Sequence, residues 1–127
     1  MSDPATGDKD MLMTRLGKLI ATADSYDPLP HADETMDCRY DIYQIVWQEA
    51  SDMRSSGELL ALGSKIRCPV VAIHGNYDPH PDAGVREPLS RVLKDFRFIL
   101  LEKCGHQPWT ERHARERFYQ ILKEEIG

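Results

Sequence analysis

The stretch Pro69-Val-Val-Ala-Ile-His-Gly-Asn-Tyr-Asp78 decides the fold that this sequence predicts. Its first five residues are apolar without alternation, a pattern typical of a strand buried on both faces, as in a parallel sheet. A second apolar run, Phe96–Leu101, follows the amphipathic segment 85–93, and helical spacing resumes near Thr110. Strand, helix, strand and helix with short connections predict an α/β fold with two short parallel strands and flanking helices.

The first half of the chain has a different, all-helical pattern. Three segments carry apolar residues at helical spacing: 11–21, 39–52 and 57–62. The segment 24–37 between the first two is rich in Asp and Pro, which indicates a loop. The organisation we expect is a disordered lead-in (1–10), a helical segment (11–64) and a βαβα unit (65–127).

Length and composition narrow the class of protein. The chain has 127 residues and 41% hydrophobic content, which suits one globular domain. Its formal charge of -5 argues against nucleic acid and gives no reason to expect an anionic membrane as partner. No apolar run reaches the ~20 residues that cross a bilayer, and Met1–Asp10 lacks a signal-peptide core. Three irregularly spaced cysteines, Cys38, Cys68 and Cys104, favour the reducing cytoplasm.

Two polar residues follow the predicted strands at the point where each strand ends. Asp78 comes just after the first strand and His106 just after the second. A carboxylate and a histidine in these positions correspond to the orienting acid and the general base of a hydrolytic triad. The sequence contains no Gly-x-Ser-x-Gly, so the nucleophile of such a triad is absent from it.

Together, Ile66–Asp78 and Leu100–His106 resemble the last two core strands of the α/β-hydrolase family. In that family the triad acid follows one strand in a His-Gly-x-x-Asp turn, and the base follows the next strand in Gly-His. The resemblance implies Asp78 as acid and His106 as base, although Asn76 stands where many relatives have Asp. It covers residues 66–127, and the helical first half resembles part of the lid. The early strands, the oxyanion-hole loop and the nucleophile elbow have no counterpart here.

The resemblance implies hydrolysis of a small ester or acyl substrate by a Ser-His-Asp triad without a cofactor. This chain would supply the acid and the base and would be inactive alone. Dehalogenases and carbon–carbon hydrolases share the fold, so the reaction subtype stays open. Candidate pocket residues are Trp47, Tyr43 and Trp109. Trp47 and Tyr43 would serve equally well as the lid's own packing. For Trp109 the favoured alternative is packing against the first turn of the last helix.

Two alternatives belong to other classes. The first is a non-catalytic interaction module that binds a partner through the lid helices and an exposed strand edge. The partner would be a complementary N-terminal hydrolase half or a second copy of the chain. The second is a metal site at His74, Asp78 and His80, whose spacing matches no standard metal motif.

Three further residues have expected structural roles. Cys104 is expected to be a small buried hydrophobe rather than a nucleophile beside His106. Thr110 is expected to be the N-cap of the last helix. Glu111, which alternates with arginines at 112, 115 and 117, is expected to lie on a solvated helix face.

Overall fold

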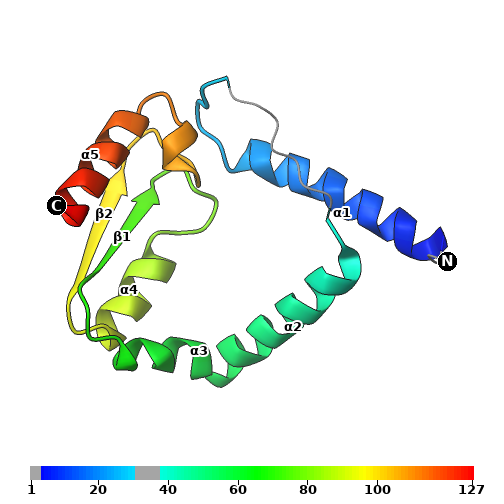
Figure 1. Cartoon of the computed structure of the whole chain (residues 1–127), viewed down its shortest axis with the longest axis horizontal. Helices are drawn as coiled ribbons and strands as arrows, with labels where there is room; N and C mark the ends of the chain where they lie inside the picture. Colours follow the sequence, from blue (N-terminus) through cyan, green and yellow to red (C-terminus); the bar gives the residue numbers. More distant parts are fainter. Residues whose placement is uncertain (1–3, 31–37) are drawn as a thin grey trace.

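The computed structural model describes residues 4–30 and 38–127. Within these ranges the chain has five α-helices and a two-stranded parallel sheet, so the predicted α/β class is confirmed at this level (Figure 1). The elements are α1 (Pro4–Ala23), α2 (Tyr40–Ser56), α3 (Glu58–Ala61), β1 (Val70–Gly75), α4 (Ala83–Val92), β2 (Phe96–Leu101) and α5 (Arg115–Ile126). Short 3-10 helices cover Leu62–Lys65 and Pro108–Thr110.

The sheet is the part of the fold that positions the site. β1 and β2 pair in parallel from Val70 opposite Phe96 to Gly75 opposite Leu101. Helix α4 makes the crossover between them, as a parallel pair requires. The two strands therefore end side by side, and the loops that follow them emerge at the same edge of the sheet (Figure 1).

A small core lies on one side of the sheet, beneath α5. Its buried members are Leu101, Cys104, Ala114 and Ile121, with Ile73, Ile99 and Phe118 packed against them. The α5 helix presents one apolar side to this core, and the helix continues past it into solvent with Ile126 exposed. Because the core residues come from β2, from the turn after it and from α5, their packing holds these three segments together.

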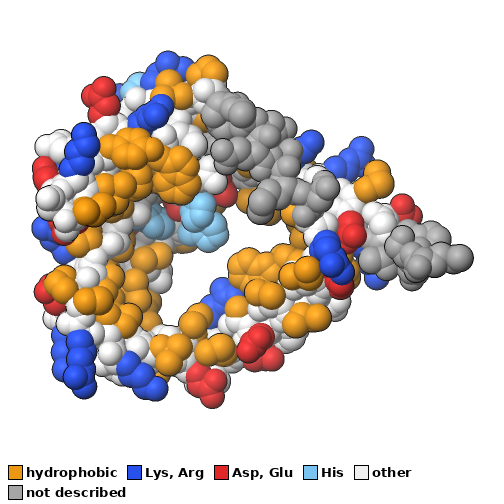
Figure 2. Space-filling view, viewed as in Figure 1, with side chains coloured by type: hydrophobic (Ala, Val, Ile, Leu, Met, Phe, Trp, Pro, Cys, Tyr) orange, Lys and Arg blue, Asp and Glu red, His pale blue; other side chains and the backbone are white. Residues whose placement is uncertain are grey.

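The remaining helices form an arc away from this core. In Figure 1 the chain closes a ring, with the sheet on one side, α3 at the base and α2 and α1 on the other side. The space-filling view shows an opening enclosed by that ring, bordered by hydrophobic side chains of α2 and by histidines across from them (Figure 2). Helix α2 has no buried residue, and Ile45 on it is 69% exposed. Such an apolar surface is typical of a site of interaction.

The turn between α2 and α3 uses Gly57 in the left-handed region, with φ of 81°. Its N–H donates to the carbonyl of Arg54, which ends α2 in the usual glycine-capped way. Throughout the described ranges, none of the helices is both long and apolar enough to cross a membrane.

Several boundary predictions were wrong. The expected disordered lead-in does not extend to residue 10, because α1 begins at Pro4; residues 1–3 lie outside the described ranges. Proline suits the first turn of a helix, so it starts α1 rather than preventing it. Of the expected loop 24–37, residues 24–30 are non-helical and residues 31–37 lie outside the described ranges.

Thr110 is not the N-cap of the last helix. Its hydroxyl donates to the Gln107 carbonyl within a 3-10 turn, and α5 begins five residues later at Arg115. A threonine followed by an apolar stripe predicted a helix that begins directly after it. Residues 111–114 instead make tertiary contacts, so the helix begins later.

Candidate active site

The loops after the two strands are joined by backbone hydrogen bonds. The Asn76 N–H donates to the Leu101 carbonyl, and the Tyr77 N–H donates to the Cys104 carbonyl, each at 2.8 Å. Gly75 permits this approach, since a Cβ there would overlap the carbonyl oxygens of Cys104 and Gly105. The two loops consequently hold their side chains at a fixed spacing.

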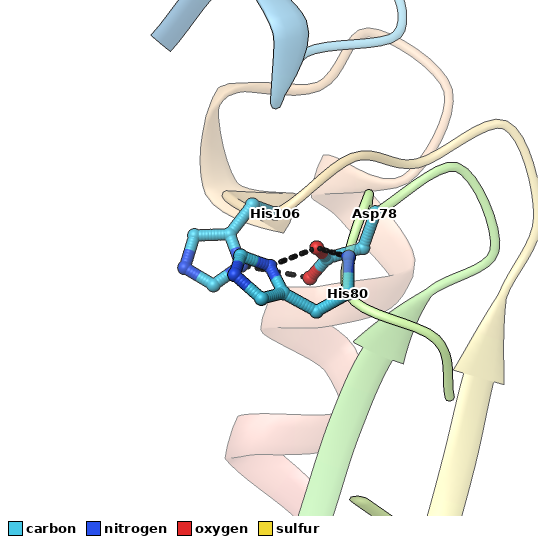
Figure 3. Close-up of side chains that lie close together, drawn as sticks. All are labelled: Asp78, His80 and His106. Atoms are coloured by element: carbon cyan, nitrogen blue, oxygen red, sulfur yellow. Dashed lines mark hydrogen bonds and ion pairs between the residues drawn. The ribbon is translucent and has the colours of Figure 1, made fainter. Parts of the chain in front are cut away.

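Asp78 and His106 meet at this edge of the sheet, as their places in the sequence predict (Figure 3). The Nδ1 atom of His106 lies 2.7 Å from Oδ2 of Asp78. The Asp78 side chain is only 3% exposed, whereas the His106 side chain is half exposed. A buried carboxylate thus holds one nitrogen of an imidazole whose other side faces solvent.

The same carboxylate binds a second imidazole. His80 places its Nδ1 atom 2.7 Å from Oδ1 of Asp78, and its backbone N–H donates to that oxygen at 2.9 Å. The rings of His80 and His106 lie next to each other, with centroids 5.2 Å apart, and each faces the carboxylate (Figure 3). The sequence suggested a link between His80 and Asp78 only within the metal alternative. The hydrogen bond between their side chains depends on how the Asp-Pro-His turn folds, which the sequence does not show.

Burial and hydrogen bonding act in opposite directions on Asp78. Burial raises the pKa of its carboxyl group, but the hydrogen bonds from His106 and from the N–H and ring of His80 outweigh it. The net result is a pKa below the ordinary value of 3.8. Asp78 is therefore an anion at neutral pH and can accept a hydrogen bond from an N–H group of each imidazole.

This lowered pKa makes acid stability depend on Asp78. The carboxylate stabilises the fold above pH 3.8, and that contribution disappears as the pH falls through the lowered pKa. Replacing both His80 and His106 by alanine is expected to raise the pKa of Asp78 and to shift acid unfolding to higher pH. NMR titration of the aspartate carboxyl carbons measures the first effect, and a pH series of urea melts measures the second. His113→Ala is the matched control; titration of Asp78 above pH 3.8 in the unaltered chain would contradict the expectation.

His74 supports the turn but does not join the cluster of possible ligands. Its Nε2 lies 2.8 Å from the His80 carbonyl oxygen and 3.7 Å from Oδ2 of Asp78. A carbonyl oxygen only accepts, so this nitrogen carries the proton. Within residues 4–30 and 38–127, the group that could hold a metal consists of Asp78, His80 and His106, with one ligand atom from each lying within 4.8 Å of the others. The combination of His74, Asp78 and His80, given above as an alternative, is thus replaced by one that includes His106.

The aromatic pocket candidates lie on two separate parts of the chain. Tyr43 and Trp47 contact each other on α2, with ring centroids 5.9 Å apart, and both are partly exposed. Trp109 lies 5.8 Å from the ring of Phe118 in the first turn of α5, as one of the two alternatives predicted. Helix α2 faces the histidines only across the opening of the ring (Figure 2).

Glu111 is a site-supporting residue that the sequence did not reveal. We expected it on a solvated helix face, and this was wrong, since it is fully buried at 0% exposure. Its carboxylate accepts the backbone N–H groups of Tyr26 at 2.7 Å, Asp27 at 2.8 Å and Gly105 at 3.3 Å. Two of these donors lie 85 and 84 residues away, so no local pattern could indicate the contacts.

The segment after α1 also contacts the histidine loop directly. The His106 N–H donates to the Asp24 carbonyl at 2.7 Å, and Gly105 packs so tightly that a Cβ there would overlap that same oxygen. The backbone of the proposed base is thereby held between the end of α1 and Glu111.

Cys104 is the buried residue that the sequence predicts. It is 0% exposed, and its thiol lies 3.4 Å from the Gly105 carbonyl oxygen. Burial, with the charges of Glu111 and Asp78, raises the pKa of the Cys104 thiol to about 11. A thiol that remains protonated and inaccessible is not a nucleophile at neutral pH.

Comparisons with protein-family models, with curated proteins and with solved structures give no match.

Proposed function

We propose that this chain supplies the acid and the base of an α/β-hydrolase-type active site that hydrolyses a small ester or acyl substrate. Asp78 is the orienting acid and His106 the general base. The observation that carries the proposal is the 2.7 Å contact between Nδ1 of His106 and Oδ2 of a 97% buried carboxylate. It arises at the carboxyl ends of adjacent parallel strands, where α/β enzymes commonly place their sites.

The geometry suits proton transfer through the outer nitrogen of His106. Because Nδ1–H donates to Asp78, the lone pair is left on Nε2, and no hydrogen bond to Nε2 is found among residues 4–30 and 38–127. A serine hydroxyl brought to Nε2 would lose its proton to His106 as its oxygen attacks the substrate carbonyl. The imidazolium, stabilised by Asp78, would then protonate the leaving group, and a water activated in the same way would release the acyl group.

In this proposal the serine comes from a Gly-x-Ser-x-Gly segment, a motif that these 127 residues do not contain. Two features of the structure support an incomplete site. The sheet has only two strands in the described part of the chain, and a sheet of this size seldom stands alone. Helix α2 also presents an uncovered apolar surface toward the opening beside the histidines (Figure 2).

The test begins with the nucleotides just before the Met1 codon. We expect a strand, Gly-x-Ser-x-Gly and helix there, in frame or displaced by a frameshift. Co-expression of that segment with this chain should give hydrolysis of p-nitrophenyl acetate, while the chain alone should be almost inert. Activity of the pair should fall by about 10⁴-fold in His106→Ala or Asp78→Asn, the usual effect of losing a triad member.

His113→Ala is the control for that experiment, because His113 is exposed, hydrogen-bonds Asp27 and contacts the ring of Tyr26, neither of which belongs to the proposed site. Fast ester hydrolysis by the chain alone that disappears in His106→Ala would show that the nucleophile lies within it. Full activity of the pair in His106→Ala would overturn the assignment of the base.

The second candidate function is a non-catalytic interaction module. Its supporting observation is the set of large exposed hydrophobic residues on α1 and α2, which include Leu19 and Ile45 at 69% exposure each. Unrelated sequence before Met1 would favour this candidate over a divided hydrolase.

A further inference from the structure

His80 has no task in the proposed hydrolysis. A triad uses one imidazole for each carboxylate, and His106 already fills that place on Asp78. Yet the His80 ring, 66% exposed, lies 2.7 Å from the other carboxylate oxygen instead of extending into solvent. Two imidazoles on one buried carboxylate are more than proton transfer requires.

We propose that Asp78, His80 and His106 form a binding site for Zn²⁺. One carboxylate and two imidazoles are the ligand types of many catalytic zinc sites, which use three protein ligands and leave a fourth position to water. The three side chains converge from the loops after β1 and β2, with one ligand atom from each within 4.8 Å of the others. This site goes beyond the proposed hydrolysis and needs no residue outside the chain.

The spacing of the ligand atoms suits a metal after a small movement. Each Nδ1 atom now lies 2.7 Å from a carboxylate oxygen. Around a tetrahedral zinc, ligand atoms about 2.1 Å from the ion lie about 3.4 Å from one another. Spacings of 2.7 Å would have to widen and those of up to 4.8 Å to narrow, each by roughly 1 Å, which small rotations of the side chains can supply. Both rings are at least half exposed and have room to do so.

Neighbouring groups would hold these ligands in place. The backbone N–H of His80 donates to Asp78 at 2.9 Å, which fixes the carboxylate, and His74 donates to the His80 carbonyl at 2.8 Å. Supporting hydrogen bonds of this kind orient the ligands of metal sites. His74 itself is excluded as a ligand through Nε2, because that nitrogen carries the donated proton.

Zinc binding would be incompatible with the proposed role of His106 as a base. Coordination through Nδ1 requires that the proton leave this nitrogen, and it then resides on Nε2. An imidazole protonated at Nε2 cannot take a proton from a serine. Zinc should therefore inhibit the complete hydrolase reversibly, with the chelator EDTA restoring activity.

Isothermal titration calorimetry of the full chain with ZnCl2 tests the site directly. Every protein in the series carries Cys38→Ser and Cys68→Ser, which removes the two thiols outside the core as competing ligands. We expect saturable binding of one ion per chain. His80→Ala, His106→Ala and Asp78→Asn should each weaken it by more than about tenfold, since even supporting residues of metal sites have effects of this size.

The matched control is His113→Ala, which removes an exposed histidine outside the cluster and should leave zinc affinity unchanged. Far-UV circular dichroism of each variant shows that it is folded. The proposal is overturned if binding is not saturable, if it persists at full strength in His80→Ala, or if His113→Ala weakens it equally. None of these outcomes bears on the hydrolase assignment, which is tested by ester turnover without metal.

Discussion

Replacing Gly75 by alanine is expected to destabilise the folded chain by about 3 kcal/mol, at the upper end of the range for overpacking a rigid interior. Gly75 is buried at the last position of β1. A Cβ there would overlap two backbone carbonyl oxygens and lie 2.7 Å from the carbonyl carbon of Cys104. Backbone cannot rotate away as a side chain does, so the loops after β1 and β2 would have to separate.

This separation should also break the contact between Asp78 and His106. Urea denaturation measures the loss of stability, and the NMR signal of the His106 Nδ1 proton, shifted far downfield by its short hydrogen bond, reports the contact. Gly84→Ala is the matched control, because nothing lies within 4 Å of a Cβ at this position in α4. That substitution should stabilise the helix by up to about 1 kcal/mol. Equal stability of the two variants would show that the loops are not packed as described.

Replacing Glu111 by alanine is expected to cost about 3 to 5 kcal/mol, since it leaves three buried or partly buried N–H groups without their acceptor. The segment after α1 should detach from the loop that carries His106. Hydrogen exchange should then accelerate at the N–H groups of Tyr26, Asp27 and Gly105, while β1 and β2 keep their protection.

Glu111→Gln separates charge from shape in the same position. Glutamine keeps one acceptor oxygen but turns an NH2 group toward one of the donors, so an intermediate loss of stability is expected. Glu116→Ala, at an exposed position of α5, is the surface control and should change stability by less than about 0.5 kcal/mol. A Glu111→Ala variant as stable as this control would show that the carboxylate does not join the two segments.

The sequence predicted the sheet because its signals are local. The apolar runs at 69–73 and at 96–101, the second interrupted only by Arg97, match β1 and β2 within two residues at either end, and the spacing between them leaves room for one crossover helix. The adjacency of Asp78 and His106 follows from that topology, because residues just after neighbouring parallel strands meet at one edge. The contact between them was therefore predictable from the chain order alone.

The surroundings of the site were not predictable in this way. His80 reaches Asp78 through the particular fold of a Pro-containing turn, and Glu111 is buried by donors more than 80 residues away. Both residues are polar and stand in sequence typical of the surface, so their contacts depend on tertiary structure; Glu111 is fully buried by it, whereas His80 stays 66% exposed. Residues 4–10 were assigned to a disordered lead-in for a related reason: their polar composition concealed a helix that starts at a proline.

The bonds from Glu111 to Tyr26 and Asp27 constrain how the chain can fold. They join positions 85 and 84 residues apart, and closing so long a loop costs entropy before any contact is gained. During synthesis, the stretch after α1 leaves the ribosome long before its acceptor has been made. This stretch can therefore reach its final conformation only after residue 111 has been made, and contacts of such high sequence separation generally slow folding.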